Sequence, residues 1–513
     1  MTDEKQNIPD SWFYLSIITL GIYLIIRLID QSKMINIFAL DIVNDYSSHM
    51  AQLYFLDKCG FHNICNYWYN GFELFKSYPP SWFFFTDFFI MNLTKNNIML
   101  STYISLITMI VMSFITILIL GKLINLSLVK RIAFFILIIA NPLSIGNFIR
   151  LGRMPEFIGW VFFLPLAFLI FLYKEKEFDN KSLLFILFYF LIMISNPFVI
   201  ILSHILILGL FLIKPKKEKI RLIIYCSIGA IFSSFWWLPY LINIFNNTIL
   251  GAVRSTRMWD FSGPWFNDNI LGIIIPICMW LIFYLYLKNN ELKKQKELIF
   301  FAPILLVSIL FFIRVIPFIP ILKHIYPDAF LFFFLFFIIF YLFRINYKSI
   351  SNKERALIFT FLIVTPIIAI ITSITLTPWF NDSQDPVARQ TVELLSKIPN
   401  EEKYLITYCS EDGCCKEPGC YIAAIYSYLV FKYDISTAGG FSPEEINKKY
   451  VERLNASTFL NENINCNIYL NNLNFLNVTY VVSYRNYCNY LENCGLEKIE
   501  IKENTCLLKN KIY

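Results

Sequence analysis

The sequence predicts an α-helical, polytopic membrane domain of about eleven spans, followed by a C-terminal extracytoplasmic α+β domain. Three observations predict this fold class. Hydrophobic residues make up 57% of the 513 residues, and mean hydropathy is +0.56. Apolar runs of roughly 18–20 residues, the length that crosses a bilayer, recur as far as residue 376. Short basic turns separate many of these runs.

Each apolar run is one expected span, and only 182–213 needs separate treatment. A single helix over this stretch would exceed a hydrocarbon core about 30 Å thick. Asn196-Pro197 interrupts it, and Pro disfavours the helical conformation of the residue before it. Two short spans that turn here fit best, while a kinked single span or a re-entrant pair stays open. The other expected spans are 11–30, 98–120, 129–149, 155–173, 220–245, 269–288, 297–316, 329–343 and 356–376.

The distribution of Lys and Arg predicts the orientation. Five turns carry 19 of these residues: 121–131, 174–181, 214–221, 288–297 and 344–355. With eleven spans, all five lie on one side, which the positive-inside rule makes cytoplasmic. We therefore expect a cytoplasmic N-terminus in the cell membrane. The same turns account for the net charge of +7, so no nucleic-acid partner is implied.

The expected domains are a membrane domain over 1–376, with a long first outer loop at 31–97, and a Cys-rich extracytoplasmic domain over 377–513. In the tail, apolar runs shorten and β-prone segments alternate with turn residues. "STAGGF" (436–441) is either a flexible turn that lets the backbone approach a ligand or a plain tight turn.

Ten of the 12 cysteines lie in the expected outer segments, where disulfides persist. The alternative for "CSEDGCCKEPGC" (409–420) is a zinc site, but the segment has no His and no clean pair of C-x-x-C motifs. Disulfides are therefore the favoured interpretation.

A polar face follows the first span. Asp41, Asp45 and His49 are spaced four apart, so on a helix they share one face. Asp45 is the best candidate for a general base, or for a ligand of a divalent cation such as Mg²⁺ or Mn²⁺. Asp41 lies nearer the span and is a candidate for substrate binding, with a capping or spacing role as the alternative.

Cationic side chains near the outer ends of other spans suit a lipid-linked anionic substrate, because phosphate groups bind Arg and Lys. Each residue alone is equally typical of an interfacial anchor or a solvated cap. The candidates for substrate binding in these loops are Arg153, Glu156, Arg254, Arg257, Lys323 and His324.

The arrangement resembles the GT-C superfamily of membrane glycosyltransferases, which have about a dozen spans and a long first outer loop with a catalytic acidic residue. More closely, it resembles prokaryotic membrane proteins labelled "6-pyruvoyl-tetrahydropterin synthase-related". The matching residues are Asp45 and His49, Trp68, Gly71, Tyr78-Pro79-Pro80, and Gly152, Arg153 and Glu156. The resemblance implies catalytic roles for Asp45 and His49 and a substrate-binding role for Tyr78. The family's Arg after the Pro of "HIYPDAF" is replaced by Asp328.

The function that follows is transfer of a sugar from a polyprenyl-phosphate donor to a glycan or protein acceptor on the outer face, with membrane lipid as a further partner. A lipid or solute transporter is a second hypothesis, but it predicts polar residues near the midplane and repeated halves. His204 alone makes no such pathway. A non-catalytic scaffold with a partner-binding tail is the third.

Overall fold

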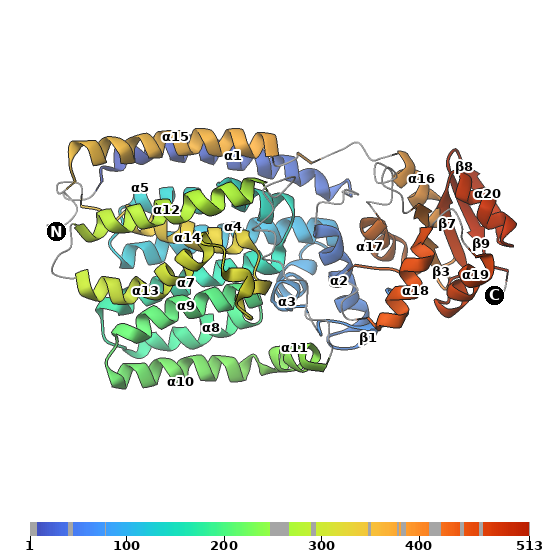
Figure 1. Ribbon diagram of the computed structural model, residues 1–513, viewed down its shortest axis with the longest axis horizontal. Coiled ribbons are helices and arrows are strands. Elements are labelled where there is room, and N and C mark those ends of the chain that lie inside the picture. The colour runs from blue at the N-terminus through green and yellow to red at the C-terminus, as the bar shows by residue number, and fades with distance from the viewer. Residues whose placement is uncertain are drawn as a thin grey trace. The chain divides into compact units, whose positions relative to one another are not determined.

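The computed structural model describes residues 8–38, 45–76, 78–246, 266–288, 294–346, 350–376, 379–380, 386–409, 422–441, 446–460 and 465–511. The chain forms two compact units (Figure 1). The helical unit comprises Met1–Gln31, Pro79–Trp82 and Leu106–Trp379. The loop–tail unit comprises Ser32–Tyr78, Phe83–Ser105 and Phe380–Tyr513, so the first loop and the tail belong to the same unit.

The helical unit is a bundle of apolar helices, in which α12 packs on α14, α9 on α7 and α13, α8 on α7 and α10, and α1 on α5 and α15 (Figure 1). These helices are α1 (Tyr14–Gln31), α5 (Leu128–Ile139), α7 (Met154–Glu175), α8 (Leu184–Met193), α9 (Pro197–Ile213), α10 (Lys216–Phe232), α11 (Ser234–Asn246), α12 (Phe266–Lys288), α13 (Lys294–Phe312), α14 (Pro327–Leu342) and α15 (Asn352–Leu376). Helix α4 (Ile98–Leu123) begins in the loop–tail unit and continues into the bundle.

Helix α14 forms the centre of the bundle. Its sequence, PDAFLFFFLFFIIFYL, is apolar on every face, and each residue except Leu335 is buried. A helix that is hydrophobic all round must be surrounded by other helices. Phe340 stacks on Phe171 of α7 with ring centroids 3.5 Å apart.

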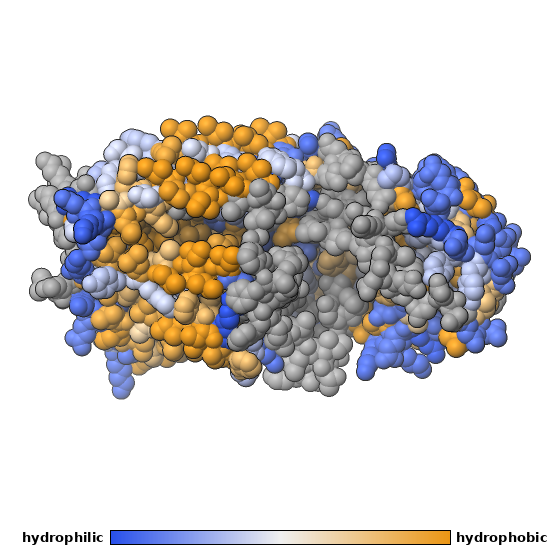
Figure 2. Space-filling view, turned by 45° about the horizontal axis from the view of Figure 1, so that its top comes forward, coloured by the Kyte–Doolittle hydropathy of each residue, from blue (hydrophilic) through white to orange (hydrophobic). Residues whose placement is uncertain are grey.

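The outer surface of the bundle is also apolar. Along α1, Ile18, Ile22, Ile25 and Ile29 are each more than half exposed, whereas the opposite face buries Arg27. Figure 2 shows apolar side chains gathered over the bundle, with hydrophilic residues at one of its ends. An apolar outer surface, with an ionisable residue such as Arg27 facing the interior of the bundle, is the pattern expected of a multi-pass membrane protein.

Five described helices are long and apolar enough to cross a membrane by themselves: Asp10–Ile35, Ile98–Leu123, Met154–Glu175, Asn269–Lys288 and Lys294–Phe312. Two bent pairs, Leu128–Ile139 with Pro142–Arg150 and Lys216–Phe232 with Ser234–Ile242, raise the number to seven. Helices α8, α9 and α14 are shorter. The count of eleven spans therefore stays a prediction.

The expected break at Asn196-Pro197 is present, since α8 ends at Met193 and α9 begins at Pro197. The Asn196 side chain accepts hydrogen bonds from the backbone N–H groups of Phe198 (2.8 Å) and Val199 (3.2 Å). It therefore caps α9, with Pro at the first helical position, as helix starts commonly do.

In the loop–tail unit, the first loop forms α2 (Tyr46–Cys59), the hairpin of β1 (Ile64–Cys65) and β2 (Phe72–Glu73), the end of α3 (Ser81–Thr86) and the π-helix η4 (Asp87–Met91). The segment 81–91 is helical throughout, and Phe88 and Phe89 are exposed by 71% and 67%.

The tail combines a mixed sheet with short helices, and its described part contains five helices: α16 (Pro386–Leu395), α17 (Ile422–Tyr433), α18 (Lys448–Thr458), α19 (Cys466–Phe475) and α20 (Asn486–Asn493). The sheet has the order β5-β3-β7-β9-β8: β5 (Ser436–Thr437), β3 (Lys403–Ile406), β7 (Tyr480–Tyr484), β9 (Thr505–Lys509) and β8 (Glu497–Lys502). Strand β3 is parallel to β5 and β7, whereas β9 is antiparallel to β7 and β8. A smaller sheet pairs β4 (Tyr408–Cys409) with β6 (Phe459–Leu460) in parallel.

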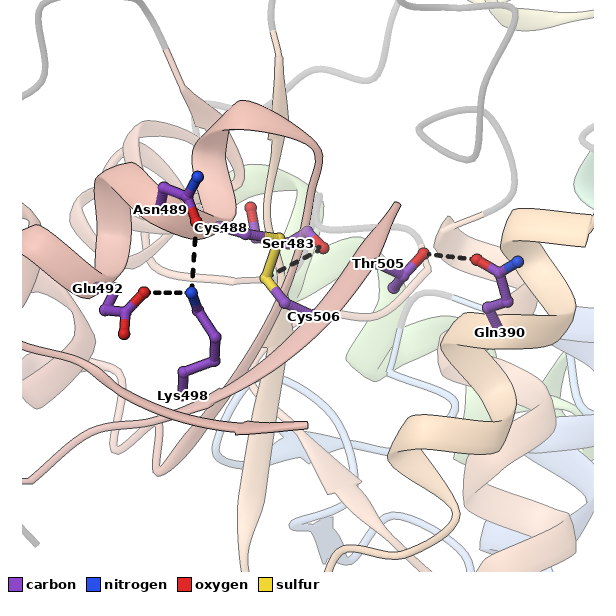
Figure 3. Close-up of a disulfide and its surroundings, with 8 residues drawn as sticks. All are labelled: Gln390, Ser483, Cys488, Asn489, Glu492, Lys498, Thr505 and Cys506. Carbon is purple, nitrogen blue, oxygen red and sulfur yellow. Dashed lines mark hydrogen bonds and ion pairs between the residues drawn. A yellow bond between two sulfur atoms is a disulfide. The ribbon is translucent and has the colours of Figure 1, made fainter. Parts of the chain in front are cut away.

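Three cysteine pairs lie at disulfide distance: Cys59–Cys65, Cys466–Cys494 and Cys488–Cys506. The last pair joins α20 to β9, and the carbonyl oxygen of Ser483 lies 3.5 Å from each sulfur (Figure 3). Beside it, Lys498 of β8 pairs with Glu492 of α20. Disulfides in the expected outer segments are thus confirmed for six cysteines, while Cys414, Cys415 and Cys420 lie outside the described residues.

The turn "STAGGF" packs tightly inside the loop–tail unit. A Cβ added at Gly440 would lie 2.8 Å from ring atoms of Trp68 and Tyr69, and one at Gly439 would lie 2.4 Å from Tyr426. Both glycines are therefore explained by close approach of the backbone to aromatic side chains. Trp68 belongs to the first loop, so this turn is one of the places where loop and tail are joined.

Candidate active site

Asp45 occupies the N-cap position of α2. Its side chain is partly exposed and makes no capping hydrogen bond. Its backbone carbonyl accepts a hydrogen bond from the N–H of His49 at 3.1 Å. Asp45 and His49 are therefore one helical turn apart, as their spacing of four residues predicts. A carboxylate at a helix N-terminus is stabilised in its charged form by the helix dipole. Asp41, the third member of the predicted face, lies outside the described residues.

The His49 ring, in contrast, is buried. It is 1% exposed and lies against the aromatic rings of Tyr78 and Phe83, with centroids 5.6 and 5.9 Å away. Burial lowers the pKa of His49 to about 3. A neutral, enclosed imidazole is suited to packing the loop and poorly suited to carrying a proton at neutral pH, so the geometry does not favour the predicted catalytic role of His49.

This environment predicts an acid-sensitive loop–tail unit. An unfolded imidazole is protonated below pH ~6.5, whereas folded His49 stays neutral down to pH about 3. The unfolded state therefore binds the extra proton, and the contribution of His49 to stability is present above pH ~6.5 and is lost as the pH falls toward 3. We expect the unfolding temperature of His49→Gln to fall less steeply between pH 7 and 4 than that of the wild type. Equal slopes in detergent-solubilised protein would contradict this assignment.

Other carboxylates of the first loop are arranged differently. Glu73 pairs with Lys76 at 2.8 Å. Burial, with the nearby charge of Asp57, raises the pKa of Asp87. Asp57 and Asp87 therefore lie close enough to interact electrostatically. Asp45, in contrast, lies at the start of α2.

In the helical unit, Arg153 and Glu156 lie together. The Arg153 guanidinium donates to Asp328 Oδ2 at 2.5 Å, lies 3.8 Å from Glu156 Oε2 and stacks over the Tyr326 ring at 4.7 Å. Asn147 donates to the same Asp328 oxygen at 2.9 Å. Two carboxylates thus offset the charge of Arg153, which weakens the expectation that Arg153 binds phosphate. The nearer of the two carboxylates is that of Asp328, which stands where the resembled family has an Arg.

Of the remaining cationic residues predicted to bind substrate, two lie among the described residues and two do not. Lys323 and His324 are partly exposed in the 3-10 helix Leu322–His324, just before Tyr326. Arg254 and Arg257 lie outside the described residues. The structure therefore brings Lys323 and His324 into the segment that meets Arg153 and leaves the other two as predictions.

Two buried arginines are not among the site residues predicted from the sequence. Arg27 on α1 and Arg150 on the π-helix η5 (Ile145–Arg150) are each 2% exposed, and η5 packs against α1. They lie close enough to interact electrostatically, together with Asp30, and the Arg27 guanidinium stacks over Trp379 at 4.4 Å. The two arginines and one aspartate carry a net charge of +1. An Arg and an Asp within an apolar run, "IIRLID", are a functional signal that could have been recognised.

No group of three or more His, Cys, Asp or Glu side chains able to hold a metal ion occurs among the described residues. Asp45 therefore belongs to no such group among the described residues. A divalent cation there stays a proposal, since Mg²⁺ and Ca²⁺ need several oxygen ligands.

Solved structures of the same fold were found at low sequence identity. The arabinofuranosyltransferase AftD from Mycobacteria matches with a TM-score of 0.55 and 12% identity over 96% of this chain, which spans only 39% of that protein. The oligosaccharyltransferase of Archaeoglobus fulgidus, tethered to an acceptor peptide containing the NVT sequon, matches with a TM-score of 0.55 and 10% identity, covering 98% of this chain and 75% of that one. AglB from the same organism, in complex with an inhibitory peptide and a dolichol-phosphate, matches with a TM-score of 0.53 and 11% identity over 97% of this chain and 74% of AglB.

These neighbours are GT-C glycosyltransferases, so the resemblance to that superfamily is supported at the level of the fold. No family model matches the sequence. No curated protein matches it. The narrower resemblance to the proteins labelled "6-pyruvoyl-tetrahydropterin synthase-related" therefore finds no support. What the chain shares with these solved structures is the fold.

Proposed function

We propose that this protein is a glycosyltransferase that moves a sugar from a polyprenyl-phosphate donor to a glycan or protein acceptor on the outer face of the membrane. The fold likeness to two kinds of glycosyltransferase over at least 96% of the chain carries the proposal. Fold alone does not imply function. The proposal therefore also draws, within the loop–tail unit, on the partly exposed carboxylate at the start of α2 and, separately within the helical unit, on the buried cationic pair at α1 and η5.

The reaction places specific demands on these residues. An acceptor oxygen forms a new bond to the anomeric carbon, the bond from that carbon to the phosphate oxygen breaks, and polyprenyl phosphate leaves with the electron pair. The acceptor's proton passes to a base, and Asp45 is the candidate. Charge that grows on the leaving phosphate is stabilised by preorganised cations.

Arg27 and Arg150 are the best candidates for that phosphate contact. They are buried, and they lie close enough to interact electrostatically. Arg presents several N–H donors in a planar fork that matches phosphate geometry. Arg153 is already paired with Asp328, so we assign it to holding the start of α7 against α14.

The transporter hypothesis, the first of the two alternatives, had His204 as its candidate for a polar group inside the membrane. Both ring nitrogens of His204 lie 2.8 Å from partners within the bundle, the Tyr189 hydroxyl and the Ile200 carbonyl. Such a histidine links neighbouring helices. The scaffold hypothesis requires a tail that is free for a partner, whereas this tail and the first loop form one unit.

Binding of polyprenyl phosphate tests the phosphate contact directly. Charge-assisted hydrogen bonds contribute about 1.5–3 kcal/mol, so Arg27→Gln or Arg150→Gln should weaken binding of a short-chain polyprenyl phosphate by roughly 10- to 100-fold. Arg355→Gln is the matched control, because it removes the same charge near the expected cytoplasmic end of α15.

Titration calorimetry in detergent, with the unfolding temperature of each variant, separates lost binding from lost folding. Wild-type affinity in both folded variants would remove these arginines from the phosphate site. Absence of any sugar transfer by the wild type from polyprenyl-linked donors would count against the proposed function itself.

A further inference from the structure

Three segments of the loop–tail unit meet at a single carboxylate oxygen. The hydroxyls of Tyr54 and Tyr67 both donate to Oδ1 of Asp434, each at 2.5 Å. Tyr54 lies on α2, Tyr67 follows β1 in the same loop, and Asp434 directly follows α17 in the tail. We call these three residues the Asp434 junction. It joins residues separated by 380 and 367 positions in the chain.

The backbone at the junction is in an unfavourable conformation. Asp434 has φ 61°, in the left-handed region that favours Gly, and its N–H donates to the Val430 carbonyl at 2.9 Å to end α17. Its side chain is exposed, so burial does not explain why Asp stands here. Apart from Gly, mainly Asn and Asp adopt this region, because their short side chains can form hydrogen bonds there. At Asp434, the two tyrosine hydroxyls donate such hydrogen bonds.

The junction belongs to a wider contact between loop and tail. Helix α2 packs along α17. The Thr437 N–H donates to the Tyr67 carbonyl at 2.9 Å, and Lys403 donates to Asn70 Oδ1 at 2.7 Å. The Asn70 amide donates in turn to the Leu476 carbonyl at 2.9 Å. The tail therefore contacts both α2 and the segment after it.

Helix α2 connects the junction with the candidate base. Tyr54 lies nine residues beyond Asp45, which is about 13 Å at 1.5 Å per residue. A helix transmits a rotation or shift of one end to the other, because its backbone hydrogen bonds keep it rigid over this length. Holding Tyr54 therefore also holds the N-terminus of α2.

We propose that Asp434 is a positioning residue, and that through Tyr54 and Tyr67 it holds α2, and hence Asp45, in the orientation needed for catalysis. The tail then contributes to catalysis by positioning α2 and is not a separate binding module. This inference rests on the proposed function, because it assigns the junction to the same site.

Substitutions at Asp434 can separate its effects. Asp434→Asn keeps an oxygen that accepts both hydroxyls, whereas Asp434→Ala removes it. Asp434→Gly removes the acceptor and also relieves the backbone, so it tests whether strain alone matters. Tyr54→Phe combined with Tyr67→Phe removes the donors. Glu452→Ala is the matched control, because it deletes an exposed carboxylate of the tail that pairs with Lys448.

Two readouts are needed, kcat and KM for sugar transfer, and hydrogen exchange of the α2 amides. We expect Asp434→Ala and Asp434→Gly to lower kcat by about tenfold with donor KM unchanged, the cost of a misplaced catalytic group. Exchange in α2 should accelerate by about tenfold in the same variants. Asp434→Asn and Glu452→Ala should stay close to wild type. The double tyrosine variant should match Asp434→Ala, and combining them should add nothing.

Wild-type kcat and wild-type α2 exchange in folded Asp434→Ala would overturn the proposal, and so would faster exchange without loss of kcat. Equal loss in Asp434→Asn and Asp434→Ala would also count against it, because the acceptor oxygen would then not matter. If the wild type transfers no sugar from a polyprenyl-linked donor, the proposed function fails. Hydrogen exchange then still decides whether the junction holds α2.

Discussion

Replacement of Asp45 by Asn is expected to lower turnover by about 100-fold or more, the scale typical of removing a general base. The change removes the negative charge and the proton-accepting oxygen with almost no change in shape. Folding should persist, because the Asp45 side chain makes no capping hydrogen bond and Asn is an equally good N-cap residue. The measurement is sugar transfer from a polyprenyl-phosphate donor in detergent or proteoliposomes.

The first loop provides controls for this experiment. Asp57→Asn makes the same chemical change in the last turns of α2, and Asp41→Asn makes it before the helix begins. Both should cost less than Asp45→Asn. Wild-type turnover in a folded Asp45→Asn variant would remove Asp45 from the mechanism. The role of base would then fall to Asp57 or Asp87, since Glu73 is paired with Lys76.

Local sequence patterns predicted much of the architecture. The apolar runs became helices, and the Asn196-Pro197 break lies where Pro and a capping Asn predict it. Six of the ten cysteines expected outside the membrane form pairs. These features depend on residues close together in the chain, so propensity, capping and periodicity suffice to recognise them. The number of spans does not follow from these patterns alone, because α8, α9 and α14 are short for a hydrocarbon core about 30 Å thick.

The burial and the partners of the candidate site residues could not be predicted from such local patterns. His49 is buried against Tyr78 and Phe83, whereas Asp45 is partly exposed. Arg153 is neutralised by Asp328, which lies 175 residues away in the sequence. Asp434 is 380 residues from Tyr54. Such pairings follow from tertiary packing, and a single sequence carries no local signal for them.

The largest expected effect on stability concerns Lys174 and Glu297 in the interior of the helical unit. Lys174 Nζ lies 2.5 Å from Glu297 Oε1, and the side chains are 1% and 2% exposed. The Tyr286 hydroxyl donates to the same oxygen at 3.2 Å, and the ammonium lies over the Phe300 ring at 5.1 Å. The pair therefore joins the end of α7 to the start of α13 in surroundings that solvate charge poorly.

Removal of one member leaves the other charge without its partner, which costs about 3–5 kcal/mol for a buried pair, whereas apolar replacement of both is often neutral. Lys174→Met and Glu297→Leu should each lower the unfolding temperature in detergent strongly, and the double variant should recover most of the loss. Lys296→Met is the matched control, because its partner Glu175 lies 3.6 Å away and both side chains are about 40% exposed. An exposed pair contributes about 0–1 kcal/mol, so this variant should unfold near the wild-type temperature. If Lys174→Met unfolds no earlier than Lys296→Met, the buried pair does not stabilise the bundle, and its role must lie elsewhere.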